Sequence, residues 1–170
     1  TVNHDQPINA QAGVNYTIEV IRGGAVVDSE TVHNLMPEEG RNHAVSVITK
    51  GATQVPTWYI GLFEGNYVPV DSDKASTFPT SATECTAYLP ATRVEFVEGA
   101  VAAGVVENTA SRAEFTATAA KTIYGAFLVS AQAKGAITGV LMSAARFTAP
   151  KVLQIDDVLR VTASFSLTSA

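Results

Sequence analysis

Two carboxylates in the segment Asp71-Ser72-Asp73 form the arrangement best suited to binding a cation such as Ca²⁺, because this ion prefers oxygen ligands. The segment lacks the glycine at the sixth position and the distal glutamate of an EF-hand loop, so we interpret it as a solvated loop. The pair Asp156-Asp157 is typical of a turn. The sequence leaves open whether Asp71 and Asp156 meet in the folded chain.

Nucleophilic chemistry would require Cys85, the only cysteine, to lie beside a histidine. A single cysteine excludes an internal disulfide and a zinc site built from several thiolates. The three histidines, His4, His33 and His43, fall in a predicted arm, a hairpin end and a helix, and no pair has metal-ligand spacing. We therefore interpret Cys85 as a buried apolar residue of a strand. We expect no catalytic residue, no metal and no cofactor, and hence a protein that is not an enzyme.

The segment TWYIGLFEGNYVPVDSDKASTF (57–78) contains the only tryptophan, and it could line a ligand pocket with Trp58 stacked on a sugar. We favour a strand over residues 57–63, because apolar side chains point to both of its faces, as in a strand that is covered on both sides. Gly61 would allow a neighbouring side chain or backbone to approach closely. Residues 64–82 contain two prolines and several Ser, Thr and Asn residues, which predicts a long surface loop.

The composition indicates a weakly charged chain that is long enough to fold as one domain. It has 170 residues, 16% of them charged, and a net charge of −5. The basic residues are dispersed, so they form no stripe that would follow nucleic-acid phosphates. No apolar run reaches the roughly 18 to 20 residues that span a bilayer, and the first residues do not resemble a signal peptide. We expect a protein made in a cytoplasm, with no membrane and no nucleic acid as direct partners.

The first third of the chain predicts three elements in succession. Residues 1–14 are polar and lack periodicity, which indicates an extended N-terminal arm. Residues 15–33 predict a β-hairpin, because Gly23-Gly24 tolerates the positive φ angles of a tight turn. Residues 37–50 change to a helical period and predict one short amphipathic helix, in which the glycine at position 40 is unfavourable.

The remainder of the chain alternates short apolar segments with turn residues. We predict strands over 83–89, 91–97, 112–118, 121–130, 137–147 and 158–167, with a loop at 98–111. Strands at this spacing, mostly without helices between them, predict a mainly β protein, an antiparallel β-sandwich or jelly roll. Residues 15–170 are expected to form this single domain behind the arm.

Several motifs resemble those of one family of virion proteins. The chain contains W-Y-x-G-L in TWYIGLFEGNYVPVDSD, T-A-Y-x-x-A-T-R in TECTAYLPATRVEFV and Y-G-A-F-L in NTASRAEFTATAAKTIYGAFLVSA. In combination with IEVIRGGAVVDSETVHNLMPEEGRNHAVSV, KGAITGVLMSAARF and DDVLRVTASFSL, they resemble tailed-bacteriophage capsid cement (decoration) proteins. The resemblance runs from about residue 14 to residue 170.

This resemblance implies a jelly-roll fold and a structural role on the outside of an HK97-type shell. Such a protein would be a dimer or trimer that bridges neighbouring major capsid proteins and stabilises the shell, and its location would be the virion. The family has no catalytic residues to transfer. We expect contacts with the partner on the arm, at Ile8 and Val14, and on the loop at 66–78, at Tyr67, Asp71 and Phe78.

Two other functions remain open on the sequence alone. A tail or baseplate component could bind the host through the 64–82 loop and the strand that contains Trp58. An enzyme, either a glycan hydrolase or a cysteine hydrolase, would need Cys85 or Asp71 as a functional group.

Overall fold

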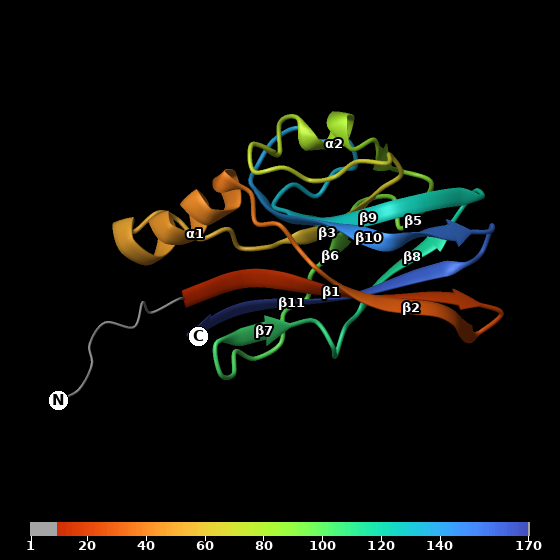
Figure 1. Ribbon diagram of the computed structural model, residues 1–170, viewed down its shortest axis with the longest axis horizontal. Helices are drawn as coiled ribbons and strands as arrows, with labels where there is room; N and C mark the ends of the chain where they lie inside the picture. Colours follow the sequence, from red (N-terminus) through yellow and green to blue (C-terminus); the bar gives the residue numbers. More distant parts are fainter. Residues whose placement is uncertain (1–9, 170) are drawn as a thin grey trace.

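The computed structural model describes residues 10–169, which form two antiparallel sheets packed face to face (Figure 1). Sheet A has the order β2 (Ala25–His33), β1 (Ala10–Arg22), β11 (Val158–Ser169), β8 (Ala113–Ala117) and β5 (Tyr88–Leu89), with β7 (Val105–Glu107) also paired to β11. Sheet B has the order β10 (Leu141–Leu153), β9 (Lys121–Val129), β3 (Tyr59–Phe63) and β4 (Glu84–Cys85), with β6 (Val94–Glu95) also paired to β3. The predicted antiparallel β-sandwich is confirmed, whereas its assignment as a jelly roll stays a prediction.

One apolar core fills the space between the two sheets. Sheet A contributes the alternate residues Val14, Tyr16 and Ile18 of β1, and sheet B contributes Ile60 and Leu62 of β3. All five side chains are fully buried or nearly so. Because successive side chains of a strand point to opposite faces, this alternation is what directs each sheet's apolar face inward.

The strand β1 is longer than expected at its N-terminal end. The predicted hairpin is present, and Gly23 and Gly24 have φ angles of 57° and 83° in its turn. The predicted arm was too long, however, because residues 10–14 belong to β1 and pair with β11 from Ala10 opposite Ser169 onward. A polar segment becomes a strand here because a distant strand supplies its hydrogen-bond partners.

The predicted helix is also confirmed, as α1 (Glu38–Lys50). Pro37 precedes its first turn, and Gly51 ends it with a φ angle of 65°. The glycine at position 40 is buried against β10, where an added Cβ would overlap the carbonyl oxygen of Met142. This residue therefore allows the helix to approach the edge of sheet B closely, which outweighs its low helix propensity.

Both faces of sheet B are covered, as the two-sided apolar pattern of β3 predicted. Its inner face meets sheet A, while Phe63 on its outer face belongs to a second apolar cluster with Phe78. The segment 64–82 forms the cover and includes a short helix, α2 (Phe78–Ser81) (Figure 1). This segment is therefore packed against the sheet, and the expectation of a solvated loop holds only for part of it.

Several strand boundaries differ from the predictions. The predicted strands 83–89 and 91–97 contain only the two-residue strands β4, β5 and β6, and the predicted loop 98–111 contains β7. The predicted strand 137–147 is β10, which begins at Leu141, passes an irregularity between Arg146 and Lys151 and continues to Leu153. Local periodicity misses such strands because two residues show no period and a bulge interrupts one.

Candidate functional site

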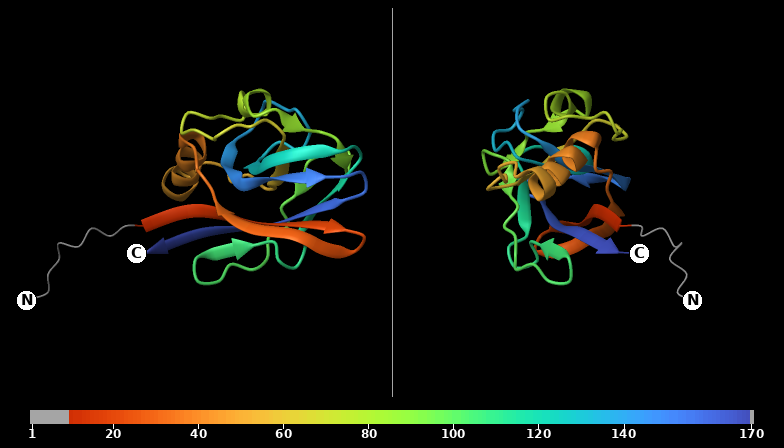
Figure 2. Two further views of the ribbon diagram at one scale, coloured as in Figure 1. Left: turned by 45° about the vertical axis from the view of Figure 1, so that its right-hand side comes forward. Right: turned by 90° about the vertical axis from the view of Figure 1, so that its left-hand side faces the viewer.

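A largely apolar groove of about 300 Å³ opens between α1 and one end of the sandwich. One wall is the face of α1 that carries His43, Ala44, Val47 and Ile48. The remaining lining comes from both sheets and the connections between them, namely Gln54, Trp58, Phe96, Glu98, Val101, Val106, Leu128, Met142, Phe165 and Leu167. We call this feature the α1 groove. Figure 2 shows α1 beside the end of the sandwich where β1 begins and β11 ends.

The groove exists because the apolar pattern of β11 continues beyond the closed core. Along this strand Val161 and Ala163 are fully buried, Phe165 is half-buried, and Leu167 is 47% exposed. The apolar positions of α1 recur at helical spacing and so lie on one side of the helix. Helix and strand therefore present apolar side chains to the same space without filling it.

The mouth of the α1 groove carries exposed apolar side chains. Ile48 is 69% exposed on α1, and Val101 is 75% exposed in the connection that precedes β7. Leu167, on β11, is 47% exposed. Single exposed apolar residues are ordinary on protein surfaces, but a group of them around an apolar groove is typical of a binding site for another molecule.

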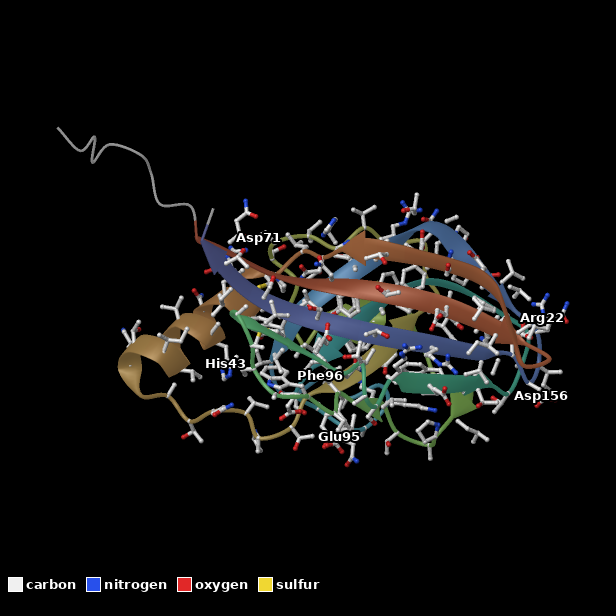
Figure 3. All side chains as sticks on the ribbon, turned by 90° about the horizontal axis from the view of Figure 1, so that it is seen from below. Arg22, His43, Asp71, Glu95, Phe96 and Asp156 are labelled. Atoms are coloured by element: carbon white, nitrogen blue, oxygen red, sulfur yellow. The ribbon has the colours of Figure 1, made fainter. Side chains whose placement is uncertain are left out.

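Polar groups occupy two sides of the groove. The imidazole of His43 meets the indole of Trp58 edge-on, with ring centroids 5.7 Å apart. Glu98 lines the opposite side, close to β7, because the amide of Gly99 donates to the carbonyl of Glu107 at 2.8 Å. Figure 3 shows His43 on α1 and Phe96 nearer the middle of the molecule. The groove therefore combines an apolar floor with few polar side chains, as binding sites commonly do.

Two of the predicted contact residues are wrong. Val14 and Phe78 are both 0% exposed, so neither side chain can reach a partner in this fold. Val14 faces the sandwich core, and Phe78 lies in the second cluster, where its ring meets that of Phe63 edge-on at 5.6 Å. Ile8, the third apolar contact that the sequence predicted, lies outside the described residues.

The two other predicted contact residues, Tyr67 and Asp71, stabilise their own loop. Asp71 accepts a hydrogen bond from Arg41 at 2.6 Å, and its carbonyl accepts one from the amide of Glu38 at 3.0 Å. The hydrogen bond from Arg41 lowers the pKa of Asp71. The hydroxyl of Tyr67 donates to Asp73 at 2.7 Å, and desolvation together with this carboxylate raises the pKa of Tyr67 to about 12. These contacts hold the loop against the start of α1, away from the α1 groove.

The candidate chemical groups are not brought together. Figure 3 shows Asp71 and Asp156 at opposite ends of the molecule, so the two carboxylates do not form a common site. Cys85 is buried in β4, and desolvation raises the pKa of its thiol to about 11. Within residues 10–169, no three His, Cys, Asp or Glu side chains are grouped as a metal site would require.

Parts of the α1 groove are predictable from the sequence, whereas their meeting in space is not. The apolar face of the predicted helix and the apolar face of the last strand were both legible in the sequence. Their meeting depends on the position of α1 beside the sandwich, which no local pattern contains. The available signal was the apolar side chain of Leu167, which extends the alternation of β11 past the length needed for the core.

Comparison with known proteins gives no assignment. The amino-acid sequence matches no protein-family model, and no curated protein matches it. In the described part of the chain, none of the helices is long and apolar enough to cross a membrane. Function is therefore inferred from the α1 groove and from the sequence motifs.

Proposed function

We propose that this protein is a structural protein of a phage virion, a cement protein that binds the outer surface of the capsid and bridges major capsid proteins. The observation that supports this most strongly is the α1 groove with its exposed apolar mouth, formed by Ile48, Val101 and Leu167. A surface of this kind favours association with protein. The resemblance of the W-Y-x-G-L, T-A-Y-x-x-A-T-R and Y-G-A-F-L motifs supplies the phage context.

The proposed mechanism requires binding and no reaction. A protein that binds the assembled shell, and not the free capsid subunits, stabilises the shell by mass action. Each copy would contact two neighbouring subunits, and a dimer or trimer would add avidity because its copies bind the same lattice together. The cytoplasm of the host is the proposed place of synthesis, and the capsid surface the final location.

The structure of the 64–82 segment makes the alternative function less suitable. A tail or baseplate module that binds host cells was expected to use this loop together with the strand that contains Trp58. Phe78 is buried, and Tyr67 is half-buried and bonded to Asp73. Few aromatic groups of the segment are thus free to contact a receptor.

Shell binding is the experiment that tests the proposal. Purified protein is mixed with capsid shells that lack it, and bound protein is measured by co-sedimentation and by cryo-electron microscopy. We expect ordered density at lattice positions on the outer surface and a higher temperature of shell disruption. Density at the tail alone would refute the capsid location and support the alternative.

Two variants with matched exposure locate the contact. Ile48→Ser combined with Leu167→Ser changes the mouth of the α1 groove, and we expect it to abolish shell binding while the protein stays folded. Val26→Ser combined with Ile155→Ser changes exposed side chains, 52% and 62% accessible, at the β1–β2 and β10–β11 turns. This control should bind as the original chain does. Equal binding by both variants would exclude the groove as the contact.

A further inference from the structure

We propose that the α1 groove receives a basic amphipathic segment of the partner protein, with large apolar side chains on the groove floor and Lys or Arg beside Glu98. This inference deepens the proposed function, because it names the chemistry of the partner, and it rests on that function only for the partner's location in a virion. The binding step itself can be tested with purified protein.

The floor of the groove selects for apolar side chains. Trp58, Phe96 and Phe165 provide aromatic surface, and all three also pack with the sandwich core, so the floor is held in place from below. Val47 of α1 and Leu167 of β11 form the two sides. A rigid apolar floor binds a segment that inserts apolar side chains into it more tightly than it binds a flat polar surface.

A single carboxylate, that of Glu98, lines the side of the groove opposite α1, and it is exposed. Glu95 and Glu107 pair with Tyr59 and Ser164, so their side chains lie on the outer faces of the two sheets, away from the groove. Figure 3 shows Glu95 on the margin of the molecule. Glu98 takes part in no ion pair within residues 10–169. This side therefore attracts positive charge and repels negative charge.

The helical side of the groove has a different character. Between His43 and Lys50 the sequence of α1 is HAVSVITK, which contains no acidic residue. A bound segment would consequently be oriented, with its apolar residues toward α1 and its basic residues toward the β6–β7 side. This asymmetry would fix the orientation of the bound segment as well as the sign of its charge.

The position of the only tryptophan provides a direct measurement of occupancy. Trp58 lines the groove in contact with His43, so a segment that enters the groove changes the surroundings of its indole. The probes are three synthetic peptides of one length, composed of Leu and Lys, of Leu and Glu, or of Ser and Lys. We expect the Leu and Lys peptide to shift the fluorescence of Trp58 and to bind at least about tenfold more tightly than either other peptide.

Two charge-changing variants distinguish the effect of charge in the groove from the effect of the protein's net charge. Glu98→Lys should weaken binding of the Leu and Lys peptide by about tenfold and strengthen binding of the Leu and Glu peptide. Glu38→Lys makes the same change in net charge at the exposed start of α1, and it should leave both affinities unchanged. Fluorescence and circular dichroism of each variant confirm that it is folded.

Three results would overturn the proposal. Equal affinity for the Leu and Lys peptide and the Leu and Glu peptide would show that the site has no charge preference. Equal effects of Glu98→Lys and Glu38→Lys would exclude the α1 groove as the binding site. A concentration-dependent shift of Trp58 without peptide, with a dimer mass in sedimentation, would identify a second copy as the occupant. Because these measurements use no shells, they can fail while shell binding succeeds, and the reverse result is equally distinguishable.

Discussion

Two phenylalanine rings of sheet B each lie over a glycine of the neighbouring strand. Phe127 of β9 is opposite Gly61 of β3, and Phe63 of β3 is opposite Gly125 of β9. A Cβ at either glycine would overlap the ring that covers it. These residues come from the W-Y-x-G-L and Y-G-A-F-L motifs, or directly adjoin them, so the motifs encode one reciprocal packing arrangement.

Gly61→Ala tests this arrangement at the residue scale. We expect a loss of about 1–3 kcal/mol in the free energy of unfolding, because the ring of Phe127 must move within a packed cluster. Urea denaturation measures the loss. Gly13→Ala is the matched control, since a Cβ there would meet only the Asn34 side chain at an ordinary 3.4 Å. Equal stability of the two variants would contradict the packing described for Gly61.

Cys85 illustrates how burial controls chemical reactivity. Its thiol is buried, and desolvation raises its pKa to about 11, so the reactive thiolate is scarce near neutral pH. We expect Ellman's reagent at pH 8 to modify the folded protein far more slowly than the urea-unfolded chain. Rapid modification of the folded protein would contradict this burial and would reopen the hypothesis of a thiol enzyme.

At the scale of elements, a buried ion pair fixes the connection between β9 and β10. The guanidinium of Arg93, at the end of the T-A-Y-x-x-A-T-R motif, donates to both carboxylate oxygens of Glu84 at 2.7 and 2.8 Å. Arg93 also donates to the carbonyls of Ala131 and Ala136, and Glu84 accepts from the amide of Gly135. Backbone groups of the β9–β10 connection thus complete the hydrogen bonds of the buried pair, and the pair in turn fixes that connection.

Removing one partner of this pair should be costly. Arg93→Met leaves the carboxylate of Glu84 buried without its countercharge, and we expect the free energy of unfolding to fall by about 3–5 kcal/mol. The double variant with Glu84→Gln should lose less than the sum of the two single variants. Arg112→Met, which breaks a more exposed pair with Glu19, should cost under about 1 kcal/mol. Similar losses for Arg93→Met and Arg112→Met would contradict the buried pairing.

The turn between β10 and β11 predicts a dependence of stability on pH. Arg22 of β1 donates to Asp157 at 2.6 Å, and this hydrogen bond lowers the pKa of Asp157. A carboxylate whose pKa is lower in the folded state stabilises the fold above its unfolded pKa of about 3.9, and this contribution is lost as the pH falls through the folded pKa. We therefore expect stability to decline in acid below about pH 4.

Asp157→Asn isolates that contribution. In urea denaturation from neutral to acidic pH, the variant should be less stable than the original chain at pH 6, and the difference should shrink in acid. Asp71→Asn removes the more exposed pair with Arg41 and should have a smaller effect. Parallel curves for the original chain and Asp157→Asn would show that Arg22 and Asp157 do not stabilise the fold in this way.

The accuracy of sequence prediction varied with the length of the element. The strands β9 and β11 could be predicted because each shows its own apolar pattern over nine residues or more, and β2 because Gly23-Gly24 marks the turn that precedes it. Residues 83–97 could not, since the chain passes from sheet B at β4 to sheet A at β5 and back at β6, two residues at a time. The glycine at position 40 was interpreted as a weakness of the helix because its neighbour, β10, is distant in sequence.

The candidate site was predictable only in its parts. The charge and apolarity of α1 and β11 are local properties, whereas the α1 groove arises from their relative position. The contacts predicted at Val14 and Phe78 failed for the same reason, because an apolar residue in a polar segment has the same sequence signature whether it faces a partner or its own core. Burial depends on the tertiary structure.

At the scale of the whole molecule, β1 and β11 are joined along their full lengths. Their register runs without interruption from Ala10 opposite Ser169 to Ile21 opposite Val158. The beginning of the described chain and its end consequently lie side by side, at the end of the molecule that carries the α1 groove (Figure 1).

This adjacency determines how the molecule would respond to tension. Pulling on residues 10 and 169 opens an antiparallel ladder one hydrogen bond at a time, because the bonds lie perpendicular to the strands, whereas pulling on residues 10 and 158 loads them together. Optical-tweezer measurements should therefore give a lower rupture force for the first pair of attachment points than for the second. A load applied through residues 10 and 169 would thus unzip β1 from β11, whereas the same ladder resists a load directed along its strands.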